Sequence, residues 1–275
     1  MNAPTTVARA TPGFAAGIAF LRRSGRGVPI VLLHGIGSNA QSFVPLIGAL
    51  PEDADIIAWN APGYANSEML APSKPAPCDY AAALTQFLDA LALKHIILGG
   101  HSLGCLFAGS FTAQNPSRVA ALALLSPALG YRVAPGEPLP PAVQARIDEI
   151  EALGPQAFAD KRAARLVNGP ERKPLVFAAV RDGMAAVNVA GYAHAVNALA
   201  AGDLIADCAR ITAPTVVAIG AKDVITPPAN GRAAYGALPN ALGYHEIADA
   251  GHALPLENPA AVASHITQLI ELAHD

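Results

Sequence analysis

Short apolar runs alternate with helical segments along most of this 275-residue chain, and that alternation limits the folds open to it. The runs are rich in Ile, Leu and Val, and each ends near Gly, Pro, Asn or Ser. They are Ile30–Leu33, Ile56–Trp59, Ile96–Leu98, Leu122–Leu125 and Val216–Ile219. Continuous apolar runs of this length are typical of strands buried on both faces of a parallel sheet. Strands that alternate with helices predict βαβ units, so the expected fold class is α/β.

The segments between the runs carry helical periodicity. In Asp79–Leu93 the large apolar residues fall on one helical face, and we expect Asp79 to cap the start of that helix. Asn258 followed by Pro259 predicts the start of the last helix, because Pro is tolerated at the first helical position.

The alternation is interrupted between residues 127 and 209. This stretch opens with a Pro-rich segment, Ala134–Pro141, and continues with helical patterns and scattered Arg. The strand rhythm resumes at Thr215. We therefore predict a core formed by residues 1–126 and 210–275, with residues 127–209 as a helical cap over the sheet.

Composition and charge limit the partners. Hydrophobic residues make up 52% of the chain, and 18 basic against 21 acidic residues give a formal charge of −3. A chain this apolar can bury a large core, but it has no basic excess to hold nucleic acid. No apolar run reaches the ~18 residues of a membrane span, and residues 1–10 do not resemble a signal peptide. We expect a small-molecule partner, no nucleic acid and no membrane; assembly into a homo-oligomer stays open.

Three cysteines, Cys78, Cys105 and Cys208, are scattered without a CxxC pair. A sparse, odd set argues against a disulfide framework and against a zinc site, so we expect no metal. The same usage fits a reducing compartment and predicts a cytoplasmic location.

The sharpest local signal is the pentapeptide Gly-His-Ser-Leu-Gly at residues 100–104. It fits G-x-S-x-G, with an apolar run before it and the helix-like Leu103–Gln114 after it. In that context the serine lies on a tight strand-to-helix turn that exposes its hydroxyl at the sheet edge. This predicts Ser102 as a nucleophile, the alternative being a glycine-rich turn with a capping serine.

A serine nucleophile needs a general base and an acid that orients the base. His252 lies in a loop just beyond the strand-like Tyr244–Ile247, where open α/β sheets place their sites. Asp223 follows the run Val216–Ile219, again at a strand end. Asp249, three residues before the histidine, is the rival acid, with a turn former as its structural interpretation. We assign His252 as base and Asp223 as acid.

An attacked ester forms an oxyanion, which needs hydrogen-bond donors fixed in advance. His34-Gly35-Ile36-Gly37 follows the first apolar run, and its glycines let the backbone present an N–H. We assign the donors to the backbone amides of Ile36 and Leu103. We expect His34 to bond nearby backbone, and His101 to point away from the nucleophile and transfer no proton.

Together the four motifs HGIG, GHSLG, GAKD and GH resemble the α/β-hydrolase superfamily, from about Pro29 to Ile266. The resemblance implies a mostly parallel eight-stranded sheet flanked by helices, a helical cap over the active site and no cofactor. Residues 59–67 resemble the family's P-G-x-G-x-S loop, with Ala65 where glycine is usual. Haloalkane dehalogenases and epoxide hydrolases carry Asp at the nucleophile position, so Ser102 argues against both.

Segments at residues 191–204, 211–223 and 226–228 resemble 3-oxoadipate enol-lactonases and, in part, general carboxylesterases. The predicted function is therefore a serine hydrolase that cleaves a small carboxylic ester or lactone. A carbon–carbon bond hydrolase of a meta-cleavage pathway is an alternative, although Ala253 stands where such enzymes usually carry Trp. A ligand receptor, a transferase or a peroxidase on the same fold are further alternatives.

The cap holds the candidates for substrate contact. A substrate with a carboxylate would need an arginine there, and four are candidates by location. They are Arg162, Arg165, Arg172 and Arg181, for each of which a solvated helix face is the competing interpretation. Met184, Val187 and Tyr192 fit an apolar pocket or ordinary helix packing equally well.

Overall fold

The structure is a computed structural model that describes residues 10–274. Among these residues, eight strands form one sheet in the order β1-β2-β4-β3-β5-β6-β7-β8. Strand β1 (Thr11–Ala15) pairs antiparallel with β2 (Ile18–Arg23), and β2 pairs antiparallel with β4. All other neighbours are parallel. The parallel strands are β3 (Arg26–Leu33), β4 (Ala54–Trp59), β5 (Ile96–His101), β6 (Val119–Leu125), β7 (Thr215–Gly220) and β8 (Ala241–Ile247). The predicted α/β class and mostly parallel sheet are confirmed.

All five apolar runs lie inside parallel strands, whereas the β1–β2 hairpin had no clear sequence signal. Ala15 pairs with Ile18, and the two residues between them, Ala16 and Gly17, have φ values of 48° and 77°. Two consecutive positive φ angles make a tight hairpin turn that usually carries Asn-Gly or Asp-Gly. Alanine is an unusual residue at the first of these positions, so the turn does not stand out in the sequence.

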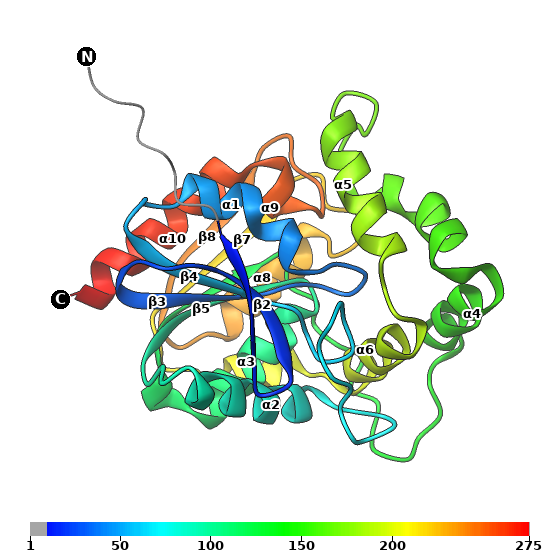
Figure 1. Ribbon diagram of the computed structural model, residues 1–275, viewed down its shortest axis with the longest axis horizontal. Coiled ribbons are helices and arrows are strands. Elements are labelled where there is room, and N and C mark those ends of the chain that lie inside the picture. The colour runs from blue at the N-terminus through cyan, green and yellow to red at the C-terminus, as the bar shows by residue number, and fades with distance from the viewer. Residues whose placement is uncertain (1–9, 275) are drawn as a thin grey trace.

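Helices cover both faces of the sheet (Figure 1). On one face lie α1 (Val44–Ala49), α9 (Leu254–Glu257) and α10 (Pro259–His274), and on the other lie α2 (Pro77–Ala90) and α3 (Gly104–Gln114). Successive residues of β3 alternate between the two layers, because side chains on a strand point to opposite faces. Ile30 and Leu32 pack in the cluster beneath α1, α9 and α10. Val31 and Leu33 pack in the cluster beneath α2 and α3.

Two helix starts differ in how they match the sequence. Asn258 accepts a hydrogen bond from the Ala261 amide, and α10 begins at Pro259 as predicted. The N-cap of helix α2 is Ala76, three residues before the predicted cap, and Pro77 occupies the first turn. Asp79 is therefore not the N-cap: it lies inside the first turn, where its carboxylate accepts from the Ala76 amide at 2.7 Å.

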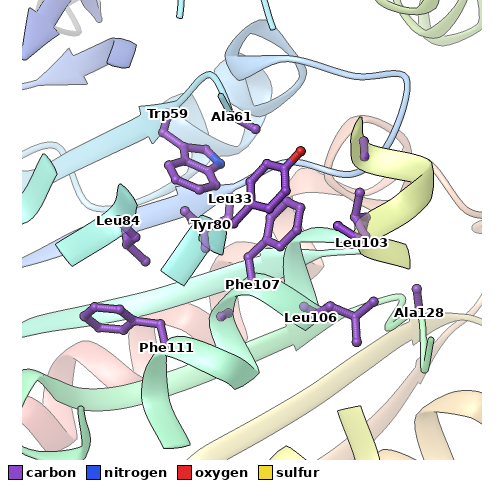
Figure 2. Packing of buried hydrophobic residues seen from close by; sticks show 14 of the residues in the cluster. Leu33, Trp59, Ala61, Tyr80, Leu84, Leu103, Leu106, Phe107, Phe111 and Ala128 are labelled. Carbon is purple, nitrogen blue, oxygen red and sulfur yellow. The ribbon is translucent and has the colours of Figure 1, made fainter. Parts of the chain in front are cut away.

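The core beneath α2 and α3 is aromatic (Figure 2). The rings of Tyr80 and Phe107 stack with centroids 4.0 Å apart, and Trp59 meets Phe107 edge-on at 6.1 Å. Leu103 and Leu106 belong to the same cluster. The start of α3 is thus packed against a rigid interior, which fixes the turn between β5 and α3.

Between β6 and β7 the chain forms a group of helices beside the sheet (Figure 1). They are α4 (Pro141–Arg162), which breaks at Gly154, η3 (Ala163–Leu166), α5 (Pro174–Ala185), α6 (Val189–Ala201) and α7 (Leu204–Cys208). Buried residues of α4 and α6 share one hydrophobic cluster with α2 and α3. The remaining elements are η1 (Ala40–Phe43), η2 (Pro116–Arg118) and α8 (Pro228–Ala237). The division into a core and a cap at residues 127–209 stays a prediction.

Candidate active site

Ser102 lies in the sharp turn between β5 and α3, with φ of 54° and 4% of its surface exposed. A positive φ is costly for a residue with a Cβ, by about 1–3 kcal/mol, and persists only where the surroundings impose it. The two flanking glycines supply that constraint. A Cβ on Gly100 would lie 2.5 Å from the Gly104 carbonyl oxygen, and one on Gly104 would lie 2.1 Å from that of Leu33. The G-x-S-x-G spacing therefore follows from close backbone packing around the serine.

Three of the predicted residues come together at the ends of their strands. Ser102 follows β5, Asp223 follows β7 and His252 follows β8. The His252 Nε2 atom lies 3.0 Å from Ser102 Oγ, and its Nδ1 atom lies 2.9 Å from Asp223 Oδ2. All three side chains are buried. A continuous hydrogen-bonded path thus joins the hydroxyl to the carboxylate through the imidazole.

Four hydrogen bonds fix the Asp223 carboxylate. Its Oδ1 atom accepts from the amides of Ile225 and Thr226, at 2.8 and 2.9 Å. Its Oδ2 atom accepts from the Thr226 hydroxyl and bonds the His252 ring. Burial alone would raise the pKa of Asp223, but His252 and the two amides outweigh burial and hold that pKa below its usual value. The ionised carboxylate accepts from Nδ1–H, which leaves Nε2 free to take a proton from Ser102.

Thr226 is a site residue that the sequence analysis missed. Its hydroxyl lies 2.9 Å from Asp223 Oδ2, 3.0 Å from the Ser126 carbonyl oxygen and 3.1 Å from His252 Nδ1. It therefore links the acid to the end of the neighbouring strand β6. The sequence signal was its position three residues after the aspartate, where a short turn can bring a hydroxyl back to the carboxylate.

The rival acid, Asp249, points away from the imidazole. Its side chain is 62% exposed, and its Oδ1 atom accepts from Asn168 and Arg172 of the cap segment. Its φ of 54° fits a turn former, since aspartate tolerates the left-handed region better than most residues. Asp223, not Asp249, is the carboxylate in hydrogen-bond contact with His252.

Ile36 and Leu103, the predicted oxyanion donors, line one cavity with Ser102. A Cβ on Gly35 would be 2.8 Å from the Ser102 Cβ, so the loop after β3 passes directly against the nucleophile. Within residues 10–274, neither the Ile36 nor the Leu103 amide donates to another loop or side-chain acceptor. Both amides remain available to a ligand, and their role as oxyanion donors stays a prediction.

Two further histidines hold the site in shape. The His34 Nδ1–H donates to the Gly35 carbonyl at 2.8 Å, and its Nε2 accepts from the Ala61 amide at 3.0 Å, as expected for a structural residue. His101 does not point away as expected: its Nε2–H donates to the His252 carbonyl at 2.8 Å, and the two rings are 5.2 Å apart. Burial lowers the pKa of His34 to about 4 and that of His101 to about 3, so both rings are neutral.

Comparison with known proteins decides the family. Residues 28–259 match the model described as the alpha/beta hydrolase fold. This chain belongs to the α/β-hydrolase family.

A putative carbamate hydrolase of Variovorax paradoxus is 29% identical over 73% of this chain and 76% of its own length. The (E)-2-((N-methylformamido)methylene)succinate hydrolase of Acinetobacter baylyi is 29% identical over 72% of this chain and 74% of its own length. The enol-lactonase structure from Burkholderia xenovorans has the same fold, with a TM-score of 0.83 at 24% identity, covering 95% of this chain and 100% of its own. The family and its hydrolase relatives support a hydrolase.

Two cavities of this α/β hydrolase meet at Ser102. One has a volume of about 380 Å³ and the other about 320 Å³. Ile36, Ser102, Leu166 and His252 line both. A substrate whose scissile bond lies at the serine would therefore have a separate space on each side of that bond.

The cap residues divide between these cavities and the surface. Arg162, Arg165, Met184 and Tyr192 line the larger cavity. Arg172 and Arg181 do not, since they pair with Asp249 and Asp182 at the surface. Val187 is buried in the helix packing. Arg146, which also lines the larger cavity, was missed because periodicity does not show which helix face turns toward the serine.

Groups that would hold a metal or span a membrane are absent from the described part of this α/β hydrolase. Residues 10–274 contain no set of three or more His, Cys, Asp or Glu side chains placed around one ion. Across the same range, no helix has both the length and the apolar character needed to cross a membrane.

Proposed function

We propose that this α/β hydrolase cleaves a small carboxylic ester or lactone through an acyl-enzyme on Ser102. The observation that supports this most is the buried path of hydrogen bonds from Ser102 Oγ through His252 to Asp223 Oδ2, at 3.0 and 2.9 Å. That path meets the geometric requirement for an activated nucleophile, which is a base within hydrogen-bond reach and a third group that orients the base.

In the first half-reaction His252 Nε2 takes the Ser102 proton as Oγ bonds to the carbonyl carbon. The carbonyl π electrons move to oxygen and form a tetrahedral oxyanion. When this collapses, the carbon–oxygen bond to the leaving alcohol breaks, and His252 gives the alcohol its proton. The ionised Asp223 stabilises the imidazolium that exists between these two proton transfers.

In the second half-reaction a water molecule replaces the alcohol. His252 takes a proton from the water as its oxygen attacks the acyl carbon, and Ser102 leaves with the proton returned. The amides of Ile36 and Leu103 would carry the oxyanion in both halves. Such donors stabilise the transition state more than the ground state, each by about 3–4 kcal/mol. With a lactone the leaving alcohol stays attached to the acyl chain, so the same steps open the ring.

The test is pre-steady-state hydrolysis of 4-nitrophenyl acetate, with the intact mass measured after acid quenching. We expect a burst of about one 4-nitrophenol per chain and a protein mass increased by one acetyl group. Ser102→Ala should lose the burst and nearly all turnover while remaining folded. Ser126→Ala is the matched control, because this buried serine at the next strand end makes no hydrogen bond through its Oγ.

Two outcomes would contradict this proposal. Full turnover in a folded Ser102→Ala protein would exclude the acyl-enzyme. Stoichiometric retention of an unmodified ester, without any turnover in the wild type, would instead favour a ligand receptor on the same fold.

A further inference from the structure

We infer that the substrate carries an anionic group, a carboxylate in the simplest case, and that Arg146 and Arg165 bind that anion in the larger cavity. The inference rests on the proposed function, since it names the class of substrate cleaved at Ser102. It starts from the lining of the 380 Å³ cavity, which includes three arginines together with the serine and His252.

The charge of this lining is one-sided. Arg146, Arg162 and Arg165 line the cavity, and no Asp or Glu of residues 10–274 lines it. The chain as a whole is slightly acidic, at −3, so this accumulation of positive charge is local. A cavity with low-dielectric walls and one sign of charge concentrates the opposite charge within it.

The three arginines differ in what already binds them. The guanidinium of Arg162 pairs with Glu149, and it also lies 4.9 Å from the centre of the Phe158 ring. Arg146 and Arg165 form no ion pair with any carboxylate of the described residues. Arg146 and Arg165 thus line the cavity without a carboxylate partner among the described residues, with Arg146 hydrogen-bonded to Tyr192, while Arg162 is held by Glu149.

Half of the six cap arginines form ion pairs within the described residues. Arg172 pairs with Asp249, and Arg181 pairs with Asp182. Arg132 forms no ion pair either, but it is exposed and does not line either cavity. Arg146 and Arg165 thus differ from the unpaired Arg132 in lining the cavity that contains Ser102.

Tyr192 shows that the positive charge reaches the buried wall of this cavity. The side chain is buried, and burial raises the pKa of its phenol. The charges of Arg146 and Arg162 oppose that rise, because a nearby cation favours the phenolate. The same field that acts on the phenol would act on a bound carboxylate.

The second cavity differs in kind. Its lining is mostly uncharged and includes one carboxylate, Asp182, and no Lys or Arg. Because Arg181 pairs with that carboxylate, the second cavity has no free positive charge to attract an anion, whereas the larger cavity has. Because Ser102 and His252 lie where the two meet, the scissile bond joins an anionic part in one cavity to an uncharged part in the other.

The test compares esters that differ in charge but not in size. One pair varies the acyl part: the mono-4-nitrophenyl ester of glutaric acid and the 4-nitrophenyl ester of its monoamide, glutaramic acid. A second varies the alcohol: the butanoate esters of 4-hydroxybenzoate and of 4-hydroxybenzamide. We expect the wild type to prefer the charged member of at least one pair by about tenfold or more in kcat/KM, mostly through a lower KM.

Arg146→Gln and Arg165→Gln should each remove most of that preference, and the double variant should abolish it. Arg132→Gln is the matched control, since it removes an unpaired cap arginine outside the cavity, and it should keep the wild-type ratio. Hydrolysis of the neutral esters with no charge preference would overturn the inference. A preference that persists in the double variant would overturn it as well.

Failure of the proposed function would be visible separately. If no ester in either pair is hydrolysed, the proposed function fails, and anion binding is then measured by thermal unfolding with glutarate or 4-hydroxybenzoate. A ligand-dependent rise in Tm for the wild type that is lost in the double variant supports the anion site. No rise with either ligand overturns it.

Discussion

The strand-end loops and the cap hold their polar side chains in opposite ways. Ser102, Asp223 and His252 are each at most 4% exposed, and short hydrogen bonds to backbone and to one another fix them. Arg146 and Arg165 reach the same cavity on long side chains, are more exposed and have no ion-pair partner. Groups that move protons need fixed geometry, whereas groups that choose a substrate need only charge and reach. This difference predicts large effects in the loops and moderate ones in the cap.

Replacing each of the two candidate acids by asparagine gives the largest expected difference in kcat/KM. Asp223→Asn should lower kcat/KM by about 10³-fold or more, because the amide no longer holds the histidine tautomer that accepts the serine proton. Asp249→Asn should change it by less than about threefold, since its exposed carboxylate contacts only the cap. Steady-state kinetics on one ester would decide, and a larger loss in Asp249→Asn would reverse our assignment of the acid.

Glu257 joins the two regions and gives the largest expected effect on stability. Its fully buried carboxylate accepts from the Gly251 amide at 2.9 Å, from the Asn168 amide at 3.0 Å and from Lys173 Nζ at 2.9 Å. Glu257→Ala leaves the two buried amides without an acceptor and leaves Lys173 with only its contacts to Asp249, so the free energy of unfolding should fall by about 3 kcal/mol. It should also lower kcat, because Gly251 directly precedes His252, the proposed base.

Urea denaturation measures the stability change, with Glu171→Ala as the matched control. The Glu171 side chain is 73% exposed and 3.7 Å from Arg172, so its loss should cost less than about 0.5 kcal/mol. Equal losses in the two variants would show that the cap and the loop of His252 are not coupled through Glu257.

Acid should destabilise the loops through their buried neutral histidines. Burial lowers the pKa of His34 to about 4 and that of His101 to about 3. Between pH 6.5 and about 4 the unfolded chain binds a proton at each site that the folded chain does not. The free energy of unfolding should therefore fall as the pH falls, by up to about 1.4 kcal/mol per pH unit for each histidine. Chemical denaturation at several pH values measures the slope, which His34→Gln should reduce. A pH-independent stability across this range would contradict the neutral assignment.

Thr226 gives the smallest of these expected effects. Thr226→Val removes the hydroxyl that bonds Asp223 Oδ2 but keeps the backbone donor to Oδ1. We expect kcat to fall by about tenfold, the worth of one hydrogen bond to a charged group. Thr112→Val is the matched control, a buried threonine whose hydroxyl bonds Ala108 in α3, and it should leave kcat unchanged. Equal kcat values in the two variants would remove Thr226 from the site.

The sequence predicted the part of this molecule that local backbone chemistry determines. The apolar runs located the parallel strands, and the glycines around Ser102 mark a turn that only small residues permit. The approach of Asp223 and His252 followed from their positions at neighbouring strand ends. Arg146 and Thr226 could not be found in this way, because helix rotation in the cap and the path of a short turn depend on tertiary packing.

The contact of His101 also depends on tertiary packing and could not be predicted from the sequence. The sequence places His101 next to Ser102, and we expected its side chain to point away. Instead its ring donates to the His252 carbonyl, a contact between residues 151 positions apart in the chain. Contacts of this kind between strand ends require the full fold.

The most direct test of the account is active-site labelling with a fluorophosphonate, read by intact mass and peptide mapping. This reagent reacts with a serine whose proton a neighbouring base can accept. We predict one adduct per chain, located on Ser102, and none in His252→Ala. A folded wild-type protein that forms no adduct, or forms it on another residue, would contradict the assignment of Ser102 as an activated nucleophile.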